Sequence, residues 1–283
     1  MTLAITSPRL PGRDDRHDQD PPPCLADVDT LRDLVHARRI DAVILDLDGT
    51  LRSNGSWLGG AAELLHELAQ LGVPHVLLTN DASCCAQEKA QQLQQAGVAC
   101  AVEHIITCAD LTLDHLRQRG WVQADLVGRL GQRAPADVAF NTVVPGQALQ
   151  HDVLVLGSGA VLSDGLLSSW CARPPAHCLV SNADLIWQPQ PGVVAACPGL
   201  LGQALDVLAH AMGQRVEFIE CGKPSRQAFR QAYARLVALA RRPLATGRVA
   251  VFGDSPYSDI VPAARMQFFP VPARTGLWRF HGE

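Results

Sequence analysis

The stretch AVILDLDGTL, residues 42–51, places two aspartates two positions apart where an apolar run ends in glycine and threonine. The apolar run predicts a buried β-strand, and the glycine predicts a turn directly after it. Side chains two apart on an extended chain face the same side, so Asp46 and Asp48 are expected to face one site. Because like charges repel, the pattern indicates either a solvated strand end or a shared positive partner.

The segments that follow this strand alternate between helical and strand-like patterns. Residues 59–72, GGAAELLHELAQLG, place leucines on one helical face, residues 74–81 form an apolar run, and residues 83–97 end in a capping glycine. The order strand–helix–strand–helix predicts a parallel sheet with crossover helices, which is a doubly wound α/β fold.

The middle of the chain has a different pattern. Between about residues 99 and 196, shorter strand candidates are separated by Pro/Gly breaks such as RPP and QPQPG. We interpret this region as a second α/β unit inserted into the first, whose pattern resumes after residue 197. The expected division is a mobile tail (1–23), the first part of the core (24–84), the inserted domain (85–196) and the second part of the core (197–283).

Composition and charge exclude several classes of function. The 283-residue chain has a formal net charge of −4 and no Lys/Arg cluster, so we expect no nucleic-acid partner. Its apolar runs are too short to span a membrane, and its beginning lacks the apolar stretch of a secretory signal. The nine cysteines form no CxxC pair and are typical of idle thiols in a reducing cytoplasm.

Polar groups stand where the predicted strands end. Ligands of open parallel sheets bind beyond the carboxyl ends of the strands. Each group alone has an ordinary explanation as a turn residue or a helix cap, but their order along the chain predicts one shared site. The positions are Asp46 and Asp48, Thr79 and Asn80, Lys223, and Asp254.

These segments resemble the four motifs of the haloacid dehalogenase (HAD) superfamily. The matching stretches are DLDGTL (46–51), LLTN (77–80), CGKPS (221–225) and GDSPYSDI (253–260), and the resemblance spans about residues 40–262. It implies a Rossmann-like core. Too few residues separate the first two motifs to form a domain, so the insertion is expected to be a C2-type α/β cap.

That arrangement is similar to the NagD-like subfamily, which includes 4-nitrophenyl phosphatases, phosphoglycolate phosphatases and pyridoxal phosphate phosphatases. Residues 58–72, 181–187 and 221–236 resemble segments of this subfamily. Its members commonly form cap-to-cap homodimers, so a homodimer is a further expectation. Within SNADLIW (181–187), Asn182 and Asp184 either line the substrate pocket or form an Asx-turn.

The resemblance implies a Mg²⁺-dependent phosphatase that acts on a small phosphorylated metabolite through an aspartyl-phosphate on Asp46. Asp48 would protonate the leaving alkoxide and then activate the hydrolytic water. The carboxylates of Asp46 and Asp254 and the backbone carbonyl of Asp48 would hold Mg²⁺. Asp259 would stand behind these ligands and orient the metal waters or the lysine.

The resemblance also implies that the second and third motifs bind the phosphate group. Thr79 would donate its hydroxyl and Asn80 its backbone N–H, while Lys223 would neutralise the phosphoryl oxygens and screen Asp46. Dehalogenase-type members have no acid two residues after the nucleophile, and P-type ATPases have a threonine there. Asp48 therefore favours a phosphatase or phosphotransferase.

Two other readings use the same residues. One is a catalytically idle HAD-like protein that binds a phosphorylated metabolite as a regulator. The other is a receiver-like phospho-acceptor, which the long inserted region disfavours. The substrate stays open among phosphoglycolate, pyridoxal phosphate, nucleotides and sugar phosphates, since specificity in this architecture comes from the cap.

Overall fold

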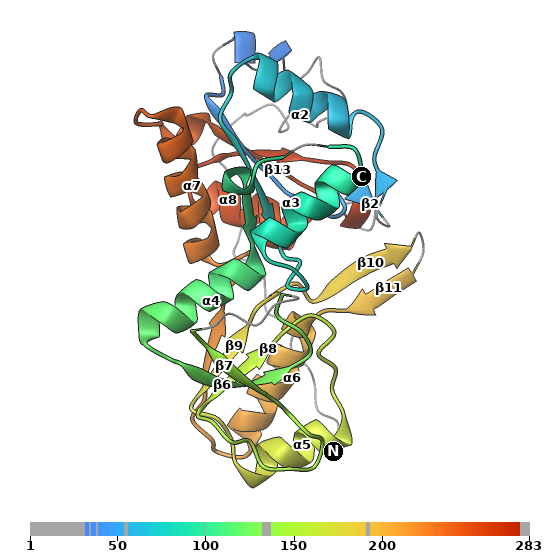
Figure 1. Ribbon diagram of the computed structural model, residues 1–283, viewed down its shortest axis with the longest axis vertical. Coiled ribbons are helices and arrows are strands. Elements are labelled where there is room, and N and C mark those ends of the chain that lie inside the picture. The colour runs from blue at the N-terminus through green and yellow to red at the C-terminus, as the bar shows by residue number, and fades with distance from the viewer. Residues whose placement is uncertain are drawn as a thin grey trace, which may run out of the picture.

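The computed structural model describes residues 32–33, 35–37, 39–53, 56–98, 100–131, 137–190 and 193–277. These residues form two α/β lobes that lie one above the other along the long axis (Figure 1). The tail expected over residues 1–23 lies outside the described residues.

The first lobe is built on a five-stranded parallel sheet with strand order β14-β13-β1-β4-β5. Residues 42–45 form its central strand, whose four side chains are all buried. Leu45 is in register with Leu77 on one side and Phe252 on the other, so the carboxyl ends of these strands lie together. The strands are β1 (Ala42–Leu45), β4 (His75–Thr79), β5 (Ile105–Thr107), β13 (Val249–Gly253) and β14 (Phe269–Pro272).

Helices cover both faces of this sheet, as a doubly wound fold requires. Helices α2 (Ala61–Gln70) and α3 (Ala86–Gln95) pack on one face, and α7 (Arg226–Ala240) and α8 (Val261–Arg265) on the other. The predicted apolar face of α2 is confirmed, because it buries Leu64, Leu65 and Leu68.

Short elements complete the first lobe near the carboxyl ends of its strands and at its connections. The strands β2 (Arg52–Ser53) and β3 (Ser56–Trp57) pair as a small antiparallel flap directly after β1. The short helices are η1 (Val102–His104), η2 (Thr246–Arg248) and η3 (Pro256–Ile260).

The second lobe is a separate five-stranded parallel sheet with strand order β12-β9-β8-β6-β7. Helix α4 packs on one face, and α5 and α6 pack on the other. The β10–β11 hairpin projects from the molecule between the two lobes (Figure 1). The elements are α4 (Cys108–Arg119), β6 (Gln123–Val127), β7 (Ala139–Thr142), β8 (Val153–Leu156), α5 (Asp164–Ala172), β9 (His177–Val180), β10 (Ile186–Gln190), β11 (Val193–Ala196), α6 (Pro198–Ala211) and β12 (Glu217–Glu220).

Strand pairing places the boundaries between the two lobes at different residues from the expected 84/85 and 196/197. Strand β5 pairs with β4, so α3 and β5 belong to the first lobe and not to the insertion. Strand β12 pairs with β9, so α6 and β12 belong to the second lobe and not to the returning core. Periodicity predicts that a strand exists, but the sheet it joins depends on long-range pairing. We therefore propose that the cap begins at α4 and ends with β12.

Two further features bear on the expected environment of the chain. No described helix combines the length and the apolarity needed to cross a bilayer. The cysteines of the described segments are free thiols, and burial raises the pKa of Cys84 to about 12.

Candidate active site

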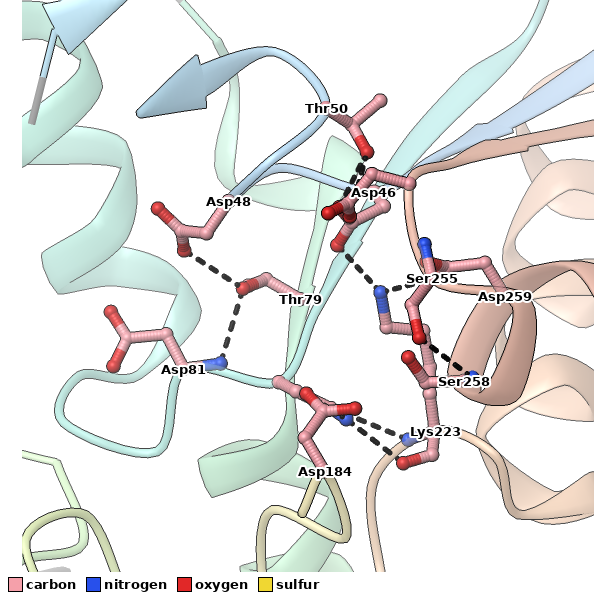
Figure 2. A network of polar contacts seen from close by, with 12 residues as sticks. Asp46, Asp48, Thr50, Thr79, Asp81, Asp184, Lys223, Ser255, Ser258 and Asp259 are labelled. Carbon is pink, nitrogen blue, oxygen red and sulfur yellow. Dashed lines mark hydrogen bonds and ion pairs between the residues drawn. The ribbon is translucent and has the colours of Figure 1, made fainter. Parts of the chain in front are cut away.

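The polar residues that follow the strands of the first sheet meet at its carboxyl edge. Asp46 follows β1, Thr79 ends β4, and Asp254 follows β13. Lys223 comes from the segment after β12, where the chain returns from the second lobe. Figure 2 shows Asp46 in contact with Lys223, and Thr79 between Asp48 and Asp81. The predicted convergence of these segments is therefore found in the structure.

Lys223 is the central cation of this network. Its Nζ donates to Asp46 Oδ1 at 2.5 Å and to Asp259 Oδ1 at 2.7 Å. All three side chains are buried, with at most 7% exposed. Burial disfavours the charged ammonium, but the carboxylates of Asp259 and Asp46 outweigh it and raise the pKa of Lys223. The lysine is therefore a fixed positive charge beside the Asp46 carboxylate.

Three buried carboxylates surround a common point next to this lysine. One oxygen from each of Asp46, Asp254 and Asp259 lies within 4.8 Å of the others. Burial and the neighbouring acids raise the pKa of Asp254, and they raise that of Asp259 to about 7. One ammonium cannot neutralise three carboxylates. The cluster has the hard oxygen donors and the deficit of positive charge that suit a divalent cation such as Mg²⁺.

The backbone around Asp254 makes room for this cluster. Gly49 has a φ of +98°, and a Cβ there would overlap the Asp254 carboxylate. The Leu277 N–H donates to Asp254 Oδ2 at 2.6 Å, and the Thr50 hydroxyl donates to Asp46 Oδ2 at 2.7 Å. These contacts hold the carboxylates in place, so the residues present fit a metal ion. The expected role of the Asp48 backbone carbonyl as a ligand stays a prediction.

Asp48 has partners that differ from those of Asp46. Its carboxylate lies 3.6 Å from Arg52 Nε and accepts from the Thr79 hydroxyl at 3.5 Å, and 49% of its side chain is exposed. Lys223 pairs with Asp46, so the idea of one positive partner for both aspartates is not confirmed. Loss of hydration among the surrounding protein atoms raises the pKa of Asp48, while the positive charge of the nearby Lys89 opposes this shift. An accessible carboxyl with a raised pKa suits proton transfer.

The side chain of Asn80 joins the two lobes. Its Nδ2 donates to the Lys223 carbonyl at 2.8 Å and to Asp184 Oδ2 at 3.0 Å, and its Oδ1 accepts from the Lys223 N–H at 2.8 Å. This two-way contact positions the backbone of Lys223. The expected contact of the Asn80 N–H with phosphate stays a prediction.

The structure contains the Asx-turn that was one of the two alternatives for Asn182 and Asp184. Asn182 Oδ1 accepts from the Asp184 N–H at 2.8 Å, which is the Asx-turn. The turn brings the Asp184 carboxylate to Asn80, at the boundary between the lobes (Figure 2). Contact of either residue with a substrate stays a prediction.

Several residues of the site were not singled out from the sequence. Thr50 bonds Asp46 although the motif alone assigned it no role, and Arg52 reaches Asp48 from the flap. Lys89 lies four residues before the buried Leu93 on α3, so its position on the apolar face was the available signal.

The raised carboxyl pKa values predict how pH and Mg²⁺ act on stability. An acid whose folded-state pKa is raised stabilises the fold at low pH, and this contribution is lost as pH rises from about 4 to about 7. Metal binding needs ionised carboxylates, so the increase in Tm caused by Mg²⁺ should be larger at about pH 7.5 than at about pH 5. Thermal unfolding with Mg²⁺ or EDTA at both pH values measures this. An equal increase at both, or one that persists in Asp254→Asn, would contradict the metal assignment.

Comparison with known families adds to this geometry. The family model described as haloacid dehalogenase-like hydrolase matches residues 43–163. An acid sugar phosphatase of Staphylococcus haemolyticus (strain JCSC1435) is 23% identical over 235 residues, which cover 83% of this chain and 85% of that protein.

Solved structures show the same fold. A 4-nitrophenylphosphatase from Thermotoga maritima aligns with a TM-score of 0.65 and 21% identity over 84% of this chain and 87% of that one. NagD from E. coli K-12 aligns with a TM-score of 0.59 and 23% identity over 82% and 87% of the two chains. The two-lobed architecture is thus shared with these proteins.

Proposed function

We propose that this chain, whose residues 43–163 match the haloacid dehalogenase-like hydrolase family, is a phosphatase that hydrolyses a small phosphate monoester on Asp46. The observation that carries this proposal is the position of the Asp46 carboxylate. It is buried at the carboxyl edge of the sheet against Lys223, with the accessible Asp48 carboxyl nearby. The phosphatase names of the relatives support the same reaction.

The proposed reaction has two steps. In the first, an oxygen of the Asp46 carboxylate attacks phosphorus, the bond from phosphorus to the ester oxygen breaks, and Asp48 gives its proton to the leaving alkoxide. In the second, Asp48 takes a proton from water, the water oxygen attacks phosphorus, and inorganic phosphate leaves Asp46 as a free carboxylate.

Positive charge and hydrogen-bond donors stabilise both steps. Lys223 neutralises the phosphoryl oxygens, and the Thr79 hydroxyl donates to one of them. The cluster of Asp46, Asp254 and Asp259 would hold the metal, and we propose Mg²⁺ because these carboxylates offer hard oxygen donors. When bound, the metal supplies charge neutralisation at the phosphoryl group.

The relatives and the second lobe support a proposal for the substrate class. We propose a phosphorylated metabolite of the sugar phosphate type, since the acid sugar phosphatase covers most of this chain. Asp184 would contact the substrate where the second lobe meets the site.

The free, largely buried thiols support a cytoplasmic location, and a homodimer stays a prediction.

Phosphate release tests the proposal directly. Hydrolysis of 4-nitrophenyl phosphate is expected with Mg²⁺ and should be lost with EDTA, and a panel of phosphorylated metabolites led by sugar phosphates identifies the substrate. Tight binding of a phosphate ester without turnover in the presence of Mg²⁺ would instead favour the idle regulator.

A further inference from the structure

Helix α3 carries a buried lysine to which none of the roles above assigns a function. The Lys89 side chain is 2% exposed, and its Nζ donates to Asp81 Oδ2 at 2.6 Å. Burying an ammonium is costly unless it is paired, and a buried pair adds little net stability. The pair therefore contributes little net stability to the fold, and its position beside the site points to a role there.

Asp81 connects this lysine to the loop after β4. Its Oδ1 accepts from the N–H of Ser83 at 2.8 Å and from the Ser83 hydroxyl at 2.6 Å, which closes an Asx-turn. Its own N–H donates to Thr79 Oγ1 at 3.1 Å (Figure 2). The ion pair with Lys89 thus holds the residue that bonds the Thr79 hydroxyl.

The bond from Asp81 restricts the direction of the Thr79 hydroxyl. Because the oxygen accepts the Asp81 N–H on one side, its own proton is directed elsewhere, and in the structure it is donated to Asp48 Oδ2 at 3.5 Å. Figure 2 shows Thr79 between Asp48 and Asp81. A continuous path of contacts therefore leads from Lys89 through Asp81 and Thr79 to the proposed proton donor.

The pair is charged on both sides. The carboxylates of Asp48 and Asp81 outweigh burial and raise the pKa of Lys89. Lys89 in turn outweighs burial at Asp81 and lowers the pKa of that carboxyl. The loop is therefore held by a full ion pair at neutral pH.

We propose that Lys89 is a positioning residue which, through Asp81, aims the Thr79 hydroxyl at the transferring phosphoryl group. This inference deepens the proposed function and rests on it. It requires that the kinetic effect of Lys89 depends on Thr79 and on the charge of Asp81.

A double-mutant cycle tests the dependence on Thr79. Lys89→Met is expected to lower kcat for 4-nitrophenyl phosphate by about 30-fold while KM changes less than about threefold. In a Thr79→Val background, the same substitution should lower kcat by less than about threefold. An equal factor in both backgrounds would overturn the proposal, and so would an unchanged kcat in folded Lys89→Met. Gln91→Met, on the exposed face of the same helix, is the matched control.

A second variant keeps the test valid if Lys89→Met does not fold. In Asp81→Asn/Lys89→Met both charges are absent, while the amide oxygen and backbone N–H at position 81 can keep the turn and the bond to Thr79. It should fold and keep kcat within about fivefold of the unsubstituted protein. A double variant with kcat lowered about 30-fold or more would overturn the route through Asp81.

Binding of inorganic phosphate separates this proposal from the proposed function. If the unsubstituted protein hydrolyses no phosphate monoester, the proposed function fails, and calorimetric titration with inorganic phosphate tests the pair without turnover. Lys89→Met should then weaken phosphate binding by about tenfold in the unsubstituted background and not in Thr79→Val. Equal weakening in both backgrounds, or none, would overturn the inference.

Discussion

Asp46→Asn is expected to lower kcat for 4-nitrophenyl phosphate by at least about a thousandfold. The amide has the shape of the carboxylate but is a poor nucleophile, so no phosphoryl intermediate can form. The protein should stay folded, because the amide oxygen can still accept the bond from Lys223, and the amide N–H groups can donate to the Thr50 hydroxyl, which is able to accept as well as donate. Phosphate release under saturating Mg²⁺, together with circular dichroism, measures both expectations.

A matched variant controls for the loss of a carboxylate. Asp206 lies on α6 in the second lobe with 46% of its side chain exposed, so Asp206→Asn should keep kcat within about twofold. A well-folded Asp46→Asn protein that retains more than about a tenth of the activity would overturn the assignment of the nucleophile.

Lys223→Met is expected to cause the largest loss of stability, about 3–5 kcal/mol in the free energy of unfolding. The ammonium pairs with two buried carboxylates, and its removal leaves Asp46 and Asp259 next to each other without a cation. Activity should fall with it, because the phosphoryl oxygens lose their positive partner. Urea denaturation in the presence of EDTA measures the stability change.

Removing one of the two carboxylates that Lys223→Met leaves without a cation should recover part of that stability. Lys223→Met/Asp259→Asn is expected to regain about 1–2 kcal/mol relative to Lys223→Met, since fewer like charges remain buried together. Mg²⁺ should also raise the stability of Lys223→Met. If Lys223→Met is as stable as the unsubstituted protein, the ion pairs of Lys223 do not stabilise this site.

Local sequence patterns predicted much of the fold. The apolar run at 42–45 is the central strand, and the leucine spacing of α2 identified its buried face. The expected boundaries placed the residues of β5 in the insertion and those of β12 in the returning core, whereas strand pairing assigns each to the other lobe. A strand joins the sheet whose free edge lies within reach of its backbone, and that depends on residues far away in the chain.

The candidate site shows the same division. The order of Asp46, Thr79, Lys223 and Asp254 along the chain was sufficient to predict that they meet at the carboxyl edge of a parallel sheet. The resemblance also implied that Lys223 screens Asp46 and that Asp259 orients the lysine or the metal waters, but it did not imply the contact of Asp48 with Arg52. Lys89 is a single lysine on an amphipathic helix until the fold brings Asp81 against it.

By itself the sequence determined the alternation of strands and helices in the first part of the core, the residue types at the strand ends and the resemblance to a family. These depend on local periodicity and on residue type. Only the tertiary structure decided that Asp48 faces Arg52 and that Lys89 is buried against Asp81. Charge pairing and pKa depend on burial and on distances between side chains, and folding alone fixes both.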